Sequence, residues 1–141
     1  MELKTFKNKK ISFKYPANWE KEQPDTFNNP DCIATLSKGD ENLLNVVMLP
    51  THATLDDFKI KMEDMITDDG GVLLESDFVS RAGKDAIRVV AEMSTPDIIF
   101  EIYTYVFIYL NDIYIFELRT VEPKKDVLDE YDVLINSFEI L

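Results

Sequence analysis

Residues 98–121 decide the fold of this chain. Two apolar, strand-like runs, IIFEIYTYVFIYL (98–110) and IYIFELRTV (113–121), flank the dipeptide Asn111-Asp112. Asn and Asp tolerate the positive φ of a tight two-residue turn, so the pattern predicts an antiparallel hairpin. On one face, the predicted register pairs Tyr109 with Tyr114, Phe107 with Phe116, Tyr105 with Leu118 and Tyr103 with Thr120.

The opposite face of this predicted hairpin is also largely apolar. It pairs Leu110 with Ile113, Ile108 with Ile115, Val106 with Glu117 and Thr104 with Arg119. An antiparallel ribbon with one solvated face would alternate apolar with polar residues instead. The hairpin is therefore central in a sheet that is covered on both sides, or its aromatic face is a binding surface.

Composition indicates an acidic globular chain. Hydrophobic residues make up 45% of the 141 residues, enough for one core, so we expect residues 1–141 to form a single domain. Acidic residues outnumber basic ones by 27 to 15, for a net charge of −12. This balance disfavours nucleic acids and anionic membranes, both of which recruit Lys and Arg. It favours a basic protein partner, or simply keeps the protein in solution.

Two features of the sequence indicate the cell compartment. Cys32 is the single cysteine, which excludes an internal disulfide and a cluster of thiolate metal ligands. The opening residues MELKTFKNKK contain no apolar segment typical of a signal peptide. We therefore expect a cytoplasmic protein, unless an export leader has been removed.

The remaining periodicities predict further strands and two helices. Alternating residues predict strands at 11–15, 32–37, 43–49, 72–79 and 85–93, and a short final strand or docked tail at 138–141. Thr54 is a predicted N-cap of a helix that ends at Gly70-Gly71, and a second helix is predicted to begin at Pro123. The order predicts an α+β fold, an antiparallel sheet of about six or seven strands sandwiched by helices (α/β/α).

No group of residues predicts catalysis, a cofactor or a metal. Cys32 and His52 are a conceivable nucleophile and base, but a cysteine on an alternating strand is usually core filler. The run Asp68-Asp69-Gly70-Gly71 invites a calcium interpretation, but it lacks the spaced oxygen ligands of a calcium loop and fits a helix end better. Two acids at a helix C-terminus oppose the helix dipole.

Candidate partner-binding residues come from two surfaces. Asp57 and Asp64 belong to an acidic outer side of the first helix, which is either a solvated face or a surface for a basic partner. Tyr103, Tyr105 and Tyr114 belong to the aromatic face of the hairpin. If the helices leave part of that face uncovered, we expect self-association or docking of an apolar partner segment there.

Three segments resemble the PsbP-like family. The stretch Ile11–Trp19 (ISFKYPANW) resembles its strand and Tyr-Pro-x-x-Trp turn, Ala82–Ala86 its mid-chain glycine turn, and Ile135–Phe138 its closing segment. The resemblance implies an α/β/α sandwich without catalytic residues. It also implies a protein-binding role as adaptor, assembly factor or chaperone.

The leading hypothesis is thus a non-enzymatic protein-binding module. The alternative is a small-ligand-binding protein, or an unrecognised enzyme, with a pocket between the sheet and a helix. For that alternative we expect the hydroxyls of Tyr103, Tyr105, Tyr109 and Tyr114 to converge on a polar cavity.

Overall fold

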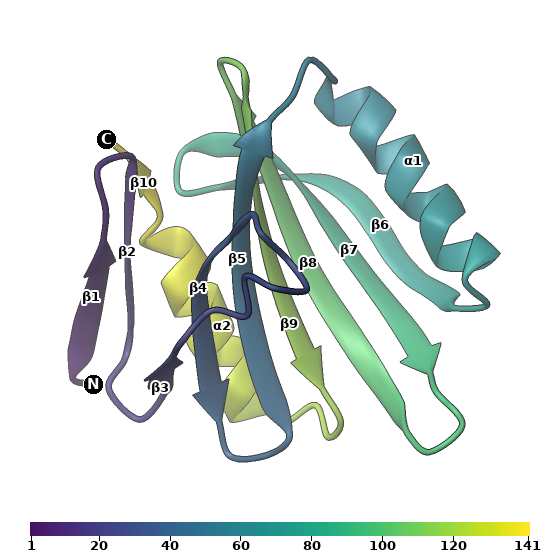
Figure 1. Ribbon diagram of the computed structural model, residues 1–141, viewed down its shortest axis with the longest axis horizontal. Coiled ribbons are helices and arrows are strands. Elements are labelled where there is room, and N and C mark those ends of the chain that lie inside the picture. Colours follow the sequence, from purple (N-terminus) through teal and green to yellow (C-terminus); the bar gives the residue numbers. More distant parts are fainter.

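The computed structural model describes all 141 residues and arranges them as two sheets and two helices (Figure 1). The larger sheet has seven strands in the order β3-β4-β5-β9-β8-β7-β6, and every neighbouring pair is antiparallel. Its strands are β3 (Glu20–Glu22), β4 (Cys32–Lys38), β5 (Asn42–Pro50), β6 (Val72–Arg81), β7 (Lys84–Ser94), β8 (Ile99–Tyr109) and β9 (Asp112–Thr120). The predicted antiparallel α+β fold is confirmed.

The central hairpin forms, but its register differs from the prediction by two residues. Tyr109 pairs with Asp112, so the turn is Leu110-Asn111 rather than Asn111-Asp112. Leu110 takes the positive φ of the turn, at 55°, a conformation that side chains other than Gly, Asn and Asp rarely adopt. Because side chains alternate with a period of two, this shift leaves every residue on its predicted face.

A separate three-stranded sheet lies beside the larger one. Its strands are β1 (Leu3–Lys7), β2 (Ile11–Pro16) and β10 (Glu139–Ile140), with β2 in the middle. Aromatic contacts join the two sheets: the ring of Phe116 lies 5.8 Å from that of Phe13 and 5.0 Å from that of Phe138. β10 confirms the predicted final strand.

Helix α2 (Lys125–Asn136) packs on the aromatic face of the larger sheet. Its Tyr131 hydroxyl lies 2.9 Å from the carbonyl oxygens of Tyr103 and Phe116, and its Glu130 pairs with Lys38 at the β4 end of the sheet. The helix begins two residues later than predicted, because Pro123 lies before the N-cap Lys124. The apolar side of the helix faces the sheet, with Val127, Tyr131, Leu134 and Ile135 buried.

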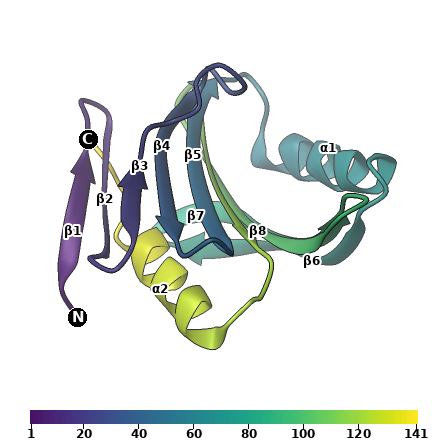
Figure 2. The ribbon, with the colours of Figure 1, turned by 60° about the horizontal axis from the view of Figure 1, so that its bottom comes forward.

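Helix α1 (Leu55–Asp68) lies on the other side of the curved sheet (Figure 2). The Thr54 hydroxyl accepts a hydrogen bond from the Asp57 amide at 3.1 Å, as the sequence predicts. At the other end, the Gly70 and Gly71 amides donate to the Thr67 and Ile66 carbonyls, the Schellman arrangement that suits a positive φ at Gly70. No residue of α1 is buried. Neither helix is long and apolar enough to cross a membrane.

The aromatic face is covered throughout its centre, which agrees with the alternative of a hairpin that is covered on both sides. Its central residues are each at most 2% exposed: Tyr105, Phe107, Tyr114, Phe116 and Leu118. Phe13 of the small sheet and Phe138 share the covering with α2, and Tyr109 at the end of β8 is 51% exposed. The open area of the sheet lies on the α1 face.

Candidate functional site

A row of polar side chains crosses the α1 face of the larger sheet. Cross-strand pairing aligns Thr104 of β8 with Glu117 of β9, Glu117 with Asn45 of β5, and Asn45 with Thr35 of β4. These four residues are called the polar row below. Paired residues in an antiparallel sheet point to the same side, so the four side chains share one face. Val89 of β7 continues the row as an apolar member beneath α1.

The members of the polar row differ in how their hydrogen-bonding groups are satisfied. The Thr35 hydroxyl donates to Asn45 Oδ1 at 2.7 Å. Glu117 accepts from Arg119 Nε at 2.6 Å. Thr104 is 1% exposed, and its hydroxyl has no hydrogen-bond partner in the protein. A buried hydroxyl without a partner is costly, which makes Thr104 the least satisfied point of the row.

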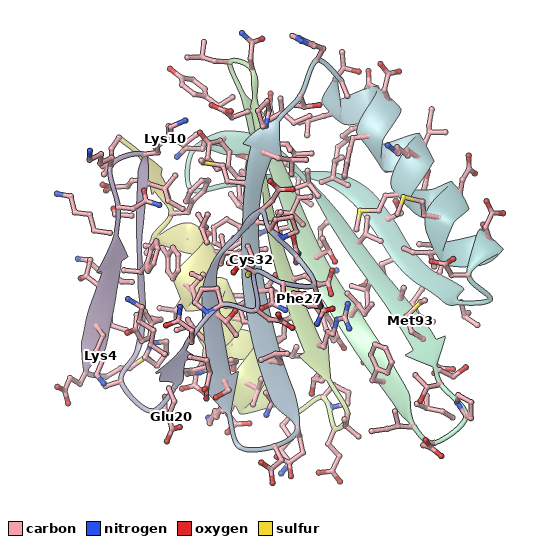
Figure 3. All side chains as sticks on the ribbon, viewed as in Figure 1. Lys4, Lys10, Glu20, Phe27, Cys32 and Met93 are labelled. Atoms are coloured by element: carbon pink, nitrogen blue, oxygen red, sulfur yellow. The ribbon has the colours of Figure 1, made fainter.

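A pocket of about 250 Å³ opens at the Thr104 end of the row, beneath the second half of α1. It is called the methionine pocket here, because three of its walls are thioethers (Figure 3 labels Met93). Its lining comprises Met62, Met65 and Ile66 of α1, the C-cap residue Asp69, and Val89, Ala91, Met93, Ile102, Thr104, Glu117 and Arg119 of the sheet. The arrangement combines an apolar chamber with a polar floor.

A second, more polar pocket of about 370 Å³ opens at the other end of the row, where residues 23–31 pass over the sheet. It is lined by Asp25, Asn28, Asn29, Cys32, Asn45 and Arg119. Asn28 donates to the Asp25 carboxylate at 2.6 Å, and this bond lowers the pKa of Asp25. Arg119 lines both pockets, so its guanidinium stands between them.

A third pocket, of about 330 Å³, lies near the start of α1. It includes the predicted partner-binding residue Asp57 beside Phe58, Lys61 and Ile115. Asp64, the other predicted acid of this helix, is exposed and lines none of these three pockets. The structure therefore brings one of the two predicted acids to the open face.

The predicted tyrosines lie on the opposite face of the sheet. Tyr105 and Tyr114 are buried in the core, where they support the fold and present no contact surface. Tyr103 is half-buried, and its hydroxyl donates to Glu101 Oε2 at 2.5 Å. Burial, then the bond to the Glu101 carboxylate, raises the pKa of Tyr103.

The tyrosine hydroxyls do not converge on a cavity. The Tyr105 hydroxyl donates to Asp132 and accepts from Arg88, whereas that of Tyr103 turns to Glu101 and Tyr109 is half exposed. The tyrosines of the aromatic face therefore give no support to the alternative of a ligand pocket. Pockets between the sheet and α1 lie on the opposite face instead.

Cys32 and His52 do not form a pair. Cys32 is buried, with its sulfur 3.4 Å from the Ala34 carbonyl oxygen and 3.5 Å from the Thr35 hydroxyl, and His52 is exposed. No group of three His, Cys, Asp or Glu side chains gathers as a metal site. Asp68 and Asp69 occupy the end of α1, as the helix-end interpretation predicts.

Sequence reasoning missed the polar row. The one local signal is that Glu117 and Arg119 interrupt the second strand of the apolar central hairpin. Their alignment with Asn45 and Thr35 depends on β5 pairing with β9, a contact between distant segments that no local pattern reveals.

Comparison with known structures identifies the fold. The solution structure of cyanobacterial PsbP (CyanoP) from Synechocystis sp. PCC 6803 superposes with a TM-score of 0.74 at 14% identity, over 99% of this chain and 92% of that one. A crystal structure from Bacteroides thetaiotaomicron VPI-5482 gives a TM-score of 0.66 at 11% identity, over 93% of this chain and 45% of that one.

No protein-family model matches the chain, and no curated protein matches it either. At these identities the structural likeness establishes a PsbP-like fold, which confirms the resemblance expected from the sequence.

Proposed function

We propose that this PsbP-like protein is a non-enzymatic binding module, acting as adaptor, assembly factor or chaperone, and that it holds a protein partner on its α1 face. The observation that carries the proposal is the incomplete cover of this face. α1 has no buried residue, and its closest backbone contacts are with β6, β7 and β8, at one side of the sheet. We place the partner on the pockets that lie between α1 and the segment 23–31.

Apolar side chains are available along this surface. Met65 is 53% exposed at the edge of the methionine pocket, and Leu43 is 39% exposed on β5. Phe27, 93% exposed, stands on the segment that passes over the sheet (Figure 3). Methionine and aromatic side chains are common at adaptable binding surfaces, because they offer large contact area to varied shapes.

Charge defines the partner's chemistry. Asp57, Asp69 and Glu117 line the pockets of this face, and Asp64 stands exposed on the same helix. Lys61 and Arg119 oppose them, but the chain as a whole carries a net charge of −12. Electrostatic complementarity therefore favours an apolar segment that carries basic residues. We propose that this interaction takes place in the cytoplasm, the compartment expected from the single cysteine and the polar opening residues.

Selection from a random peptide library on the immobilised protein tests the proposal. We expect enrichment of peptides that combine apolar residues with Lys or Arg. The variant Met65→Lys, which removes an apolar contact and adds a like charge, should weaken their binding by about tenfold or more.

The matched control is Ile60→Lys on the same helix. Ile60 is 59% exposed and lines none of the three pockets. Ile60→Lys therefore changes the net charge by the same amount as Met65→Lys but leaves the proposed binding surface unchanged. Equal loss in both variants would show that only net charge matters. Failure to enrich any peptide, or enrichment of acidic ones, would contradict the proposal.

A further inference from the structure

We propose that the methionine pocket binds a small organic cation, a primary ammonium group on an apolar body. This inference concerns a free small molecule and does not require the protein partner proposed above, although both use residues of the methionine pocket. It accounts for a feature that partner binding leaves unexplained, the unpaired buried hydroxyl of Thr104.

The walls of the pocket determine the body of the ligand. Met62, Met65 and Met93 line it together with aliphatic side chains, and its volume is about 250 Å³. Pockets for drug-sized ligands span roughly 300–1,000 Å³, so this one suits a single ring or a short chain. The three flexible thioethers adjust to irregular apolar shapes and make favourable contacts with aromatic rings.

The floor of the pocket provides acceptors for an ammonium group. Thr104 Oγ1 is buried, lines the pocket and lacks a partner, and Glu117 is its cross-strand neighbour. Arg119 Nε uses one oxygen of Glu117. The second carboxylate oxygen and the Thr104 hydroxyl are then two acceptors for the three donors of an ammonium group. Pairing would also remove the penalty of the buried hydroxyl.

The electrostatic field at the pocket favours a cation. The C-terminal end of α1 carries the negative end of the helix dipole, Asp68 and Asp69 add to it, and no basic residue occupies the last turn. Asp69 itself lines the pocket. The one lining cation, Arg119, pairs with Glu117 and lies 5.8 Å from the centre of the Phe100 ring. The positive charge of Arg119 offsets the negative charge of Glu117. The negative charges of Asp69 and of the helix end are left without a cation to balance them.

Titration calorimetry with three probes of one shape tests the inference: phenethylamine, phenethyl alcohol and phenylacetate. We expect the amine to bind with a dissociation constant at least about tenfold lower than that of either other probe. Binding of phenylacetate as tightly as the amine, or binding of none of the three at millimolar concentration, would overturn it.

Three variants test whether the amine binds in the methionine pocket. Asp69→Asn should weaken its binding several-fold, whereas Asp64→Asn, the same charge change on the same helix away from the pockets, should leave it nearly unchanged. Thr104→Val should weaken amine binding and at the same time raise the melting temperature of the free protein, because the unpaired buried hydroxyl is gone.

Two outcomes of this series count against the pocket. If Asp64→Asn and Asp69→Asn weaken the amine equally, the attraction is to net charge and the proposed site is wrong. If Thr104→Val raises the melting temperature without changing the affinity, the ammonium group does not lie on the polar floor and the inference fails.

Discussion

The two faces of the seven-stranded sheet are similar in sequence and differ in cover. On the aromatic face, α2 buries five of its residues and the small sheet adds Phe13 to the same core. On the other face, α1 packs the apolar residues Leu55, Phe58, Met62 and Ile66 against the sheet, yet none of its residues is buried. An apolar side on a helix is therefore not enough to make a sheet face into core. The aromatic face becomes core because segments distant in the sequence also pack on it.

The difference also separates stability from binding. A well-packed face has little freedom to accept a ligand, whereas a helix with few buried contacts belongs to the less stable part of a structure, where binding regions are usually found. The α2 face therefore provides most of the packing that stabilises the fold, and the three pockets lie on the α1 face.

A glutamate introduced on each face in turn should show the largest difference in stability between the two faces. Tyr105→Glu buries a carboxylate at a position 2% exposed and should cost more than about 4 kcal/mol, enough to unfold the protein. Met65→Glu on the α1 face should change the free energy of unfolding by about 0.5 kcal/mol or less. Urea denaturation followed by circular dichroism measures both. A folded, stable Tyr105→Glu protein would show that the aromatic face is not core.

Removing one partner of the Lys38–Glu130 pair tests how α2 is held on the sheet. The Glu130 side chain is 10% exposed, so Lys38→Met leaves a largely buried carboxylate without its partner and should cost about 2 kcal/mol. Lys38→Met combined with Glu130→Met should recover most of that loss, because no unpaired charge is then left. Thermal unfolding of the three variants measures the effect; an additive double variant would mean that the pair does not matter.

Of the single variants on the α2 face, Tyr131→Phe should have the smallest effect, about 1 kcal/mol, because it removes one hydroxyl that bonds carbonyls of β8 and β9. Burial raises the pKa of Tyr131 well above its ordinary value, so the folded state favours the neutral phenol. A group whose pKa is higher in the folded than in the unfolded protein stabilises the fold fully at pH values below its unfolded pKa, which is about 10 for tyrosine. This stabilisation is lost as the pH rises above that value. The wild type should thus lose stability more steeply than Tyr131→Phe above about pH 10; parallel curves would refute this assignment.

Much of the fold was predictable because its signals are local. The Thr54 cap, the Gly70-Gly71 helix end and the apolar faces of the central hairpin each depend on neighbouring residues, and all are present. The hairpin register was missed because Leu110, a residue poorly suited to positive φ, occupies the turn. Strand β1 was missed because its residues are exposed and polar apart from Leu3 and the buried Phe6.

The candidate site was not predictable in the same way. Its polar row exists because β9 lies between β5 and β8, which brings Asn45 beside Glu117. Likewise, the burial of Tyr105 and Tyr114 depends on Phe138 and Tyr131, which lie beyond the hairpin. Non-local pairing therefore determines where the candidate site forms in this chain.

The insertion of β9 beside β5 also has a consequence for how the chain folds. Strands β6 to β9 are joined by short turns and can assemble early, but β5 must wait for a partner far along the chain, as when Leu44 meets Leu118. Until then one edge of β5 is unpaired and open to other chains. Folding should accordingly pass through a slow docking of β3–β5 onto a preformed meander, and aggregation during refolding should begin at β5.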